Sequence, residues 1–244
     1  AVARVSNQDP DPADAAAMQE LYRGEIEYVD AQFGKLLDRL REDGLYDDTV
    51  IALVADHGEE FQEHGGWWHG TSLYEEQIHV PFLVKWAKGR APEVRDGSLG
   101  RMIDVAPTLL GQTGAEAPPS MQGVDVAAGT RSAKDQQVFA EEDHEGNVLW
   151  SLHSDGMKLI IADPNNPRGL PERELFDLRN DPDERSNLAG QGYDSLEAGL
   201  EGHAELQRSF AAGEAVSGGG EVEMDRAQCE QLKNLGYVED CSHL

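Results

Sequence analysis

Cysteine is scarce in this sequence, and its scarcity excludes two ways of building a stable fold. Only two cysteines occur among the 244 residues, Cys229 and Cys241, and both lie near the C-terminus. Two cysteines cannot form a framework of several disulfides, and they cannot supply the paired Cys motifs of a structural zinc site. The chain must therefore depend on a buried core, as one large domain or as one domain with a small appendage.

Basic residues are also few compared with acidic ones. Asp and Glu number 47 against 20 Lys and Arg, which gives a formal net charge of -27. A field of this sign repels nucleic acids and anionic membranes, so we expect no nucleic-acid partner. An anionic substrate would have to be met by a local positive centre, such as a bound cation.

Long hydrophobic runs are absent. No apolar stretch approaches the roughly 18 residues of a transmembrane helix, so no membrane span is predicted. The first 20 residues lack the apolar segment of a signal peptide. Because the chain begins with alanine rather than methionine, we interpret it as a processed or truncated product.

Hydrophobic periodicity predicts an α/β region over residues 1–115. Apolar residues follow helical spacing from 15 to 42. The run TVIALVA, 49–55, has the composition of a strand covered on both faces, as in parallel sheets. A second strand is predicted over 78–86, and a helix that a glycine ends over 102–114.

The composition changes after residue 115. Residues 116–135 are rich in Pro, Gly, Ser and Ala without periodicity, and we interpret them as a linker. Over 136–244, the segments QVFAEE, NVLWSL, GMKLII and ELFDL predict a small antiparallel sheet. A helix over 186–211 is expected to pack on this sheet, and a last short helix is expected over 223–235. The predicted fold class is α/β with a small C-terminal antiparallel α+β subdomain.

The loop ADHGEEFQEHGGWWHG, residues 55–70, is the candidate functional site. Asp56 and His57 follow a predicted strand, and ligands of open α/β sheets collect beyond the carboxyl ends of strands. A carboxylate oxygen and a neutral imidazole nitrogen are ordinary ligands of a divalent cation. In the alternative interpretation, Asp56 caps the following turn and His57 is a buried structural histidine.

The remaining histidines, tryptophans and glutamates of this loop can belong to a ligand-binding site, or they can be structural residues. Its glycines allow a ligand to approach the backbone of His64 and His69, and Trp67 and Trp68 can exclude water. Packing of at least one tryptophan against the sheet is the alternative. The three glutamates of the loop, Glu60 among them, form either a solvated face or partners that orient the histidines.

Several blocks in this order resemble the sulfatase family of the alkaline phosphatase superfamily. They are EYVDAQFGKLLDRL, GLYDDTVI, ADHGEEF, LYEEQIHVP and MIDVAPTLL, followed by ELFDLRNDPDERSNLA and LKNLGYVE, which resemble the C-terminal subdomain of bacterial sulfatases. The resemblance covers about residues 18–240. It implies part of an alkaline-phosphatase-like mixed or parallel sheet flanked by helices.

The resemblance also implies roles for single residues. Asp56 and His57 match the pair that completes a divalent-metal site, with calcium in most sulfatases and zinc or manganese in phosphotransferase relatives. His69 falls where some sulfatases have a substrate-contacting lysine and phosphoethanolamine transferases have a histidine. A basic group there can neutralise an ester oxygen or protonate the leaving oxygen. His64 and Glu60 would contact the substrate or support these residues.

The family's nucleophile motif, Cys/Ser-x-Pro-x-Arg, is absent from these residues, and so is the early acidic pair of its metal site. We therefore interpret the chain as the C-terminal half of a sulfatase-type catalytic domain, inactive without the missing N-terminal half. The resemblance implies hydrolysis of a small-molecule or glycan sulfate ester in a periplasmic or extracellular location. Two alternatives stay open: a phosphoester hydrolase or phosphoethanolamine-type transferase of the same superfamily, and a non-catalytic remnant or binding subunit.

Overall fold

The chain divides into two compact units, residues 1–200 and 201–244. The computed structural model describes residues 12–91, 100–128, 136–144, 146–190, 192, 194–213, 226 and 229. Nearly all of the last predicted helix, and residues 129–135 of the predicted linker, lie outside these ranges. In the second unit, Cys229 is buried and disulfide-bonded.

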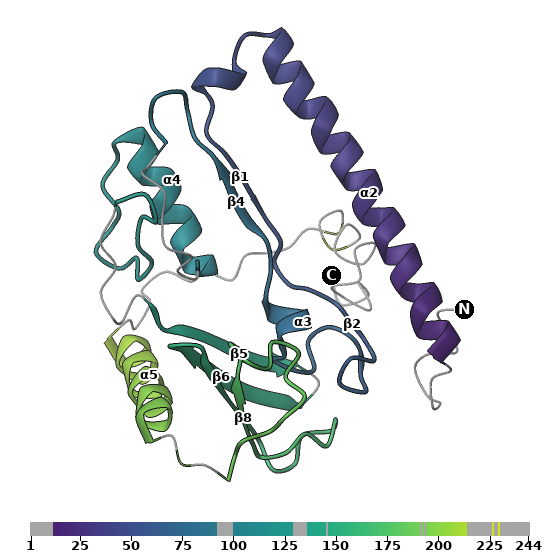
Figure 1. Ribbon diagram of the computed structural model, residues 1–244. Helices are drawn as coiled ribbons and strands as arrows, with labels where there is room; N and C mark the ends of the chain where they lie inside the picture. The colour runs from purple at the N-terminus through teal and green to yellow at the C-terminus, as the bar shows by residue number, and fades with distance from the viewer. Residues whose placement is uncertain are drawn as a thin grey trace. The chain divides into compact units, whose positions relative to one another are not determined.

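The first unit opens with a long helix and a two-stranded ribbon (Figure 1). The helix α2 spans Pro12–Glu42 and is followed by the 3-10 helix η1, Tyr46–Asp48. Strand β1, Ile51–Val54, pairs with strand β4, Phe82–Lys85. Gly44, with φ 71°, supplies the left-handed residue that lets the chain leave α2. The predicted helix and both predicted strands are therefore present.

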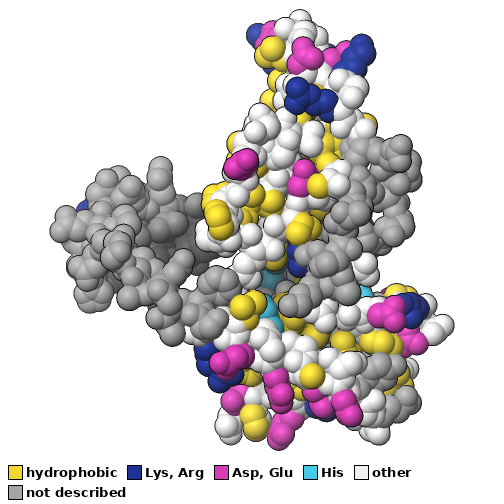
Figure 2. All heavy atoms as spheres, turned by 90° about the vertical axis from the view of Figure 1, so that its left-hand side faces the viewer, with side chains coloured by type: hydrophobic (Ala, Val, Ile, Leu, Met, Phe, Trp, Pro, Cys, Tyr) yellow, Lys and Arg dark blue, Asp and Glu magenta, His cyan; other side chains and the backbone are white. Residues whose placement is uncertain are grey.

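The surroundings of β1 differ from the predicted ones. Its four residues are only partly buried, and β4 runs antiparallel to it. In the described part of the chain β4 is the one strand that pairs with β1, so the second edge of β1 has no strand partner there. Leu83 of β4 is accordingly 62% exposed. On the face that Figure 2 shows, hydrophobic side chains are exposed in the middle and the lower part of the molecule, and acidic side chains are most numerous at its lower end.

The loop after β1 forms a tight hairpin. Strand β2, Glu60–Phe61, pairs antiparallel with β3, Trp67–Trp68, and the four-residue helix α3, Glu75–Ile78, follows. Gln62 and Trp68 have φ of 76° and 70°, a left-handed conformation that side chains other than glycine rarely adopt. Such residues persist where contacts around them hold the backbone in place.

The predicted helix over 102–114 is confirmed as η2, Met102–Asp104, and α4, Val105–Thr113. Gly114 ends it in the left-handed conformation, with φ 77°. The described part of the predicted linker bonds to this helix. The backbone N–H of Val124 donates to the buried Asp104 carboxylate at 2.9 Å.

The C-terminal sheet confirms all four predicted strands and their antiparallel pairing. The strands are β5 (Val138–His144), β6 (Asn147–Ser154), β7 (Met157–Ala162) and β8 (Arg173–Asp177). Their order is β5-β6-β7-β8, each hydrogen-bonded to the next in the chain (Figure 1). Because each connection is local, this part of the fold follows from alternating hydrophobicity and turn residues.

Both faces of this sheet are covered, since successive side chains of a strand point to opposite faces. One core contains Leu73, Tyr74, Leu149, Ile160, Ala162 and Phe176. The other contains Leu152, Leu159, Leu175 and Leu196, the last from helix α5, Asp194–Gly213. The segment before α3 is thus part of the core of the C-terminal sheet.

The helix α5 begins eight residues later than the predicted start at 186. The intervening residues extend the hydrogen bonding of β8 instead. Leu188 donates its backbone N–H to the Leu175 carbonyl at 2.8 Å, and the Asn187 side chain accepts from the Leu175 N–H at 3.1 Å. Asn competes with helix formation by bonding to nearby backbone, which delays the helix.

A buried ion cluster joins the C-terminal sheet to α3. Lys158 of β7 is fully buried, and its ammonium lies 2.8 Å from Glu75 and 2.8 Å from Glu184. Glu184 also accepts the backbone N–H of Glu75 at 2.6 Å. Burial raises the pKa of Glu184, whereas for Glu75 the effect of burial is outweighed by Lys158, so the pKa of Glu75 is lowered. The cluster therefore fixes α3, β7 and the loop after β8 to one another.

None of the helices in the described ranges is long and apolar enough to cross a membrane.

The ion cluster gives a stability prediction. We expect Lys158→Met to lower the free energy of unfolding by about 3 to 5 kcal/mol, because it leaves a buried carboxylate without its countercharge. Urea unfolding measures the change. The matched control is Lys88→Met, which removes an exposed lysine paired with the exposed Asp47 and should change stability little. A Lys158→Met variant as stable as the control would contradict this role.

Candidate functional site

Asp56 and His57 lie at the C-terminal end of β1, as predicted. Their side chains are 78% and 43% exposed, respectively. Asp56 accepts the backbone N–H of His57 at 3.1 Å, so it does support the following turn. His57 is not a buried structural histidine. Both side chains are open to a ligand.

The hydrogen bonding of His57 fixes which ring nitrogen is free. Its Nδ1 lies 2.9 Å from the carbonyl oxygen of Gly58. Because a carbonyl oxygen can only accept, Nδ1 carries the hydrogen, and Nε2 of the neutral ring has a free electron pair. Nε2 lies 3.8 Å from Oδ2 of Asp56. A donated Nδ1–H and an open Nε2 form the arrangement typical of metal-binding histidines.

Gly58 is needed for this arrangement. A Cβ at this position would lie 2.0 Å from the carbonyl oxygen of Glu76. The backbone N–H of Gly58 also donates to the Gln77 carbonyl at 2.7 Å. The turn after His57 is thus packed directly against α3, and no side chain fits between them.

His69 is brought next to His57. The two rings stack with centroids 3.8 Å apart and planes inclined by 26°. His69 Nδ1 lies 3.1 Å from the carboxylate of Glu59, and the two side chains are 48% and 15% exposed. Since the carboxylate accepts, Nδ1 carries a hydrogen, and Nε2 is the ring nitrogen that this pair does not use. The loop therefore places Asp56, His57, Glu59 and His69 together.

These residues form only part of a metal site. No group of three or more His, Cys, Asp or Glu side chains within the described ranges is arranged to hold a metal ion. Divalent cations in proteins take four or more ligands. Asp56 and His57 supply two of suitable chemistry, so a cation here requires further ligands from elsewhere.

His64 lies on the buried side of the hairpin and uses both ring nitrogens. Nδ1 lies 2.7 Å from Glu76, and Nε2 lies 3.1 Å from the carbonyl oxygen of Glu184. The ring stacks on Tyr74 at 3.8 Å. Burial opposes protonation of His64, but the bond to Glu76 outweighs it, so the pKa of His64 is raised. These contacts favour a supporting role over substrate contact.

Glu60 is fully buried and supports the hairpin from within. Its carboxylate receives the Arg168 guanidinium at 2.6 Å and the Gln77 amide at 2.8 Å. It also accepts the backbone N–H groups of His64 at 3.1 Å and Gly66 at 2.7 Å. Four donors around one buried carboxylate leave no room for a substrate.

The end of β5 borders the site as well, which the sequence did not reveal. A Cβ at Gly70 would lie 3.2 Å from the His144 ring and 3.9 Å from the Glu142 carboxylate. Gly70 has φ 76°, so both its backbone and its neighbours favour glycine. More than 70 positions separate the loop from these β5 residues and from Lys158 and Arg168. No local sequence pattern indicates that they lie near the loop.

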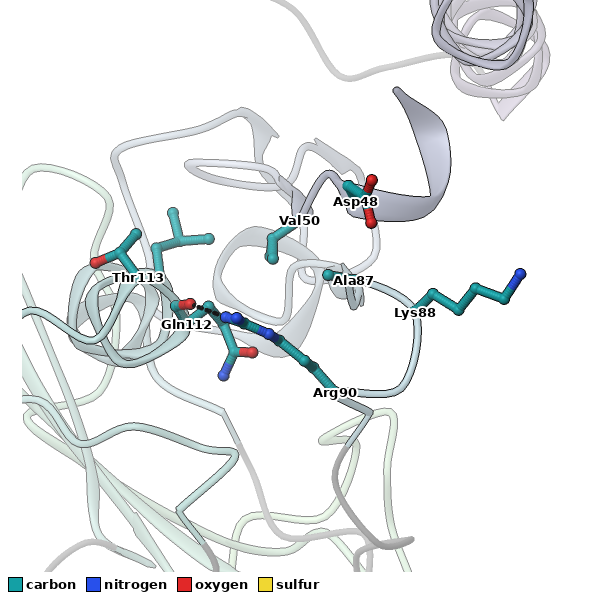
Figure 3. A pocket seen from close by; sticks show the side chains of 8 residues that line it. Asp48, Val50, Ala87, Lys88, Arg90, Gln112 and Thr113 are labelled. Atoms are coloured by element: carbon teal, nitrogen blue, oxygen red, sulfur yellow. Dashed lines mark hydrogen bonds between the residues drawn. The ribbon is translucent and has the colours of Figure 1, made fainter. Parts of the chain in front are cut away.

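A cavity of about 480 Å³ lies at the opposite end of the β1–β4 ribbon (Figure 3). It is lined in part by Val50, Lys88, Arg90 and Gln112. Arg90 donates to the Gln112 carbonyl at 2.7 Å. With about 3.3 Å per strand residue, roughly 20 Å separate Val50 from Asp56. The cavity is therefore not part of the histidine site.

Comparison with known proteins identifies relatives of both parts of the chain. Residues 2–115 match the sulfatase family, and residues 62–209 match the C-terminal region of N-sulphoglucosamine sulphohydrolase. Arylsulfatase K of Bos taurus is 30% identical over 175 residues, which cover 67% of this chain and 32% of the relative. N-acetylglucosamine-6-O-sulfatase of Bacteroides thetaiotaomicron is 26% identical over 181 residues, covering 70% and 32%.

A solved structure has a similar fold. It contains a protein in complex with its substrate D-glucosamine-2-N,6-O-disulfate, with a TM-score of 0.57 and 24% identity, and the match covers 78% of this chain and 40% of that protein. The chain spans about a third of the length of the curated relatives that it matches.

The contacts of His64 predict its titration. We expect NMR titration to give a pKa above 6.5, and Glu76→Gln to lower it. Because the folded-state pKa is raised, the pair stabilises the fold fully below about pH 6.5 and this contribution is lost as the pH rises through the folded-state pKa. The free energy of unfolding should therefore fall more between about pH 6 and about pH 8 in the native chain than in the Glu76→Gln variant. The exposed Glu20→Gln is the control, and a His64 pKa at or below 6.5 would refute the prediction.

Proposed function

Because the chain belongs to the sulfatase family of the alkaline phosphatase superfamily, we propose that it forms the C-terminal part of an enzyme that hydrolyses sulfate esters. The observation that carries this proposal is the cluster at the end of β1. It joins Asp56 and His57 to a second histidine, His69, whose ring lies 3.8 Å from that of His57. A metal-binding pair beside a proton-bearing group suits an anionic ester.

We propose that Asp56 and His57 hold a divalent cation together with ligands from the rest of the catalytic domain. The donor set supports this, since an exposed carboxylate lies beside an imidazole whose Nε2 is open. A cation here would polarise the ester oxygens. The family resemblance favours calcium. The imidazole ligand would also suit zinc or manganese, which a phosphotransferase-like enzyme would use.

His69 is proposed to act on the leaving oxygen. Glu59 holds its Nδ1–H and stabilises the ring when it is protonated, as in other carboxylate–histidine pairs. The protonated ring then presents an N–H at Nε2, which can neutralise an ester oxygen and donate its proton as the ester bond breaks. Glu60 and His64, bonded on the buried side, keep the hairpin below in place.

The missing N-terminal half of the catalytic domain is proposed to cover the open surfaces of α2 and β4. The large apolar residues Leu21, Ile26, Val29, Leu36 and Leu83 are 62%, 51%, 61%, 52% and 62% exposed. Full burial of one such side chain contributes about 1.5 to 3 kcal/mol. This exposed apolar surface is evidence for a large partner that covers it. The family resemblance assigns the formylglycine nucleophile to the missing N-terminal half.

Sulfated sugars are the proposed substrates. The names of two relatives support this, one an N-acetylglucosamine-6-O-sulfatase and the other solved with a glucosamine disulfate. An exported location, periplasmic or extracellular, is proposed from the family resemblance.

A phosphoester substrate is the alternative that one observation favours. The family resemblance places His69 where some sulfatases have a substrate-contacting lysine and phosphoethanolamine transferases have a histidine. Assay of the full-length enzyme with matched sulfate and phosphate esters decides between them. If the full-length enzyme turns over neither the sulfate nor the phosphate ester, the result supports a binding subunit.

The metal proposal predicts a loss of cation affinity in the full-length enzyme. Asp56→Ala and His57→Ala should each weaken divalent-metal binding more than about 10-fold, because each removes a ligand. Calorimetric titration with calcium, zinc and manganese measures this. Asp155→Ala, which removes a carboxylate that is 90% exposed, is the control. Unchanged affinity in both site variants would remove the pair from the metal site.

The role of His69 predicts an effect that depends on the leaving group. His69→Ala should lower kcat for a sugar sulfate about 10²- to 10⁴-fold, because a sugar alkoxide needs a proton to leave. An activated aryl sulfate should lose much less. Turnover of both esters is measured in the full-length enzyme, with His203→Ala in α5 as control. Equal losses for the two esters would contradict proton donation, and no loss would exclude His69 from the reaction.

A further inference from the structure

Arg168 reaches from the C-terminal sheet into the loop that carries the histidines. It lies in the turn between β7 and β8, and its side chain is 11% exposed. Its guanidinium donates to Glu60 at 2.6 Å, to the His64 carbonyl at 3.2 Å and to the Thr71 hydroxyl at 3.1 Å. Glu60 belongs to β2, His64 lies in the loop between β2 and β3, and Thr71 follows β3.

The space around the guanidinium matches its planar shape. A Cβ at Gly66 would lie 2.6 Å from its central carbon, so the hairpin backbone packs directly on it. The ring of Tyr74 lies on a further side, 5.8 Å away. Only arginine combines several donors in one plane with stacking on backbone and ring, and a lysine ammonium cannot replace it.

These contacts fix both ends of a short segment. Gly66, which packs on the guanidinium, is three residues before His69, and Thr71 is two residues after it. Between them Trp68 has φ 70°. A residue in this conformation needs support from its surroundings, and Arg168 supplies such support on both sides.

We propose that Arg168 is a positioning residue for His69. It holds residues 64–71 in the conformation that stacks the His69 ring on His57 and bonds its Nδ1 to Glu59. This inference rests on the proposed role of His69. Arg168 does not contact the substrate. Through its guanidinium the C-terminal sheet holds the segment that carries His69.

The test uses Arg168→Ala in the full-length enzyme. Misplacement by about 1 Å can cost 10²-fold in rate, so we expect kcat for a sugar sulfate to fall about 10- to 100-fold while KM changes much less. Added guanidinium ion at millimolar concentration should restore part of the lost kcat. The control is Arg179→Ala. It removes an exposed arginine whose partner, Asp155, lies in the turn between β6 and β7. This variant should keep its kcat, and added guanidinium should not change it.

A second variant separates positioning from folding. Arg168→Met with Glu60→Gln removes both buried charges, so neither is left uncompensated. This variant should keep a native-like Tm and still lose kcat. In the NMR spectrum of the chain, the ring signals of His69 should shift in both Arg168 variants, because the stacking on His57 is lost.

The outcomes distinguish this inference from the proposed function. A folded Arg168 variant with native kcat overturns the inference if His69→Ala is impaired. If His69→Ala has native activity, the proposed role of His69 is wrong. The NMR signals of the His69 ring then still test whether Arg168 positions that ring. Unchanged His69 signals overturn the inference whatever the activity.

Discussion

The buried contact of Lys158 with Glu75 and Glu184 is the interaction on which the arrangement of this protein depends. It joins three segments that the sequence separates widely: the helix after the histidine loop, a central strand of the C-terminal sheet, and the loop after the last strand. Buried charges are tolerated only in well-defined geometry, whereas apolar surfaces can slide past one another. The same loop supplies the carbonyl of Glu184 to His64. The histidine loop therefore has one defined position on the sheet.

The described part of the chain has a closed side and an open side. Both faces of the C-terminal sheet are covered by segments of this chain, with apolar cores on each. The β1–β4 ribbon and α2 have instead large apolar side chains in contact with solvent. The site lies between them, and its supports Glu60, His64 and Arg168 pack toward the C-terminal sheet. An active site completed from the open side agrees with this division.

The sequence predicted what local patterns determine. Alternation and turn residues identified the four strands from Val138 to Asp177, because each pairs with its neighbour in the chain. The run at β1 identified a strand, but not its antiparallel partner or its exposure, since these depend on distant segments. The loop composition predicted Asp56 and His57 as metal ligands, and the family resemblance predicted a role for His69. The structure places the three side chains together, and their roles stay predictions. The loop composition could not separate the buried His64 from the open His69, because Glu76, Glu184 and Arg168 make that difference.

The close packing of Gly66 against Arg168 has a consequence for how relatives of this protein can diverge. A side chain at position 66 would require the guanidinium of Arg168 to move, so the two positions are not independent. A larger residue at position 66 would displace the guanidinium from its hydrogen bonds, and loss of Arg168 would leave the buried Glu60 without its countercharge. The packing thus couples the two positions, and a change at one alters what the other can accept.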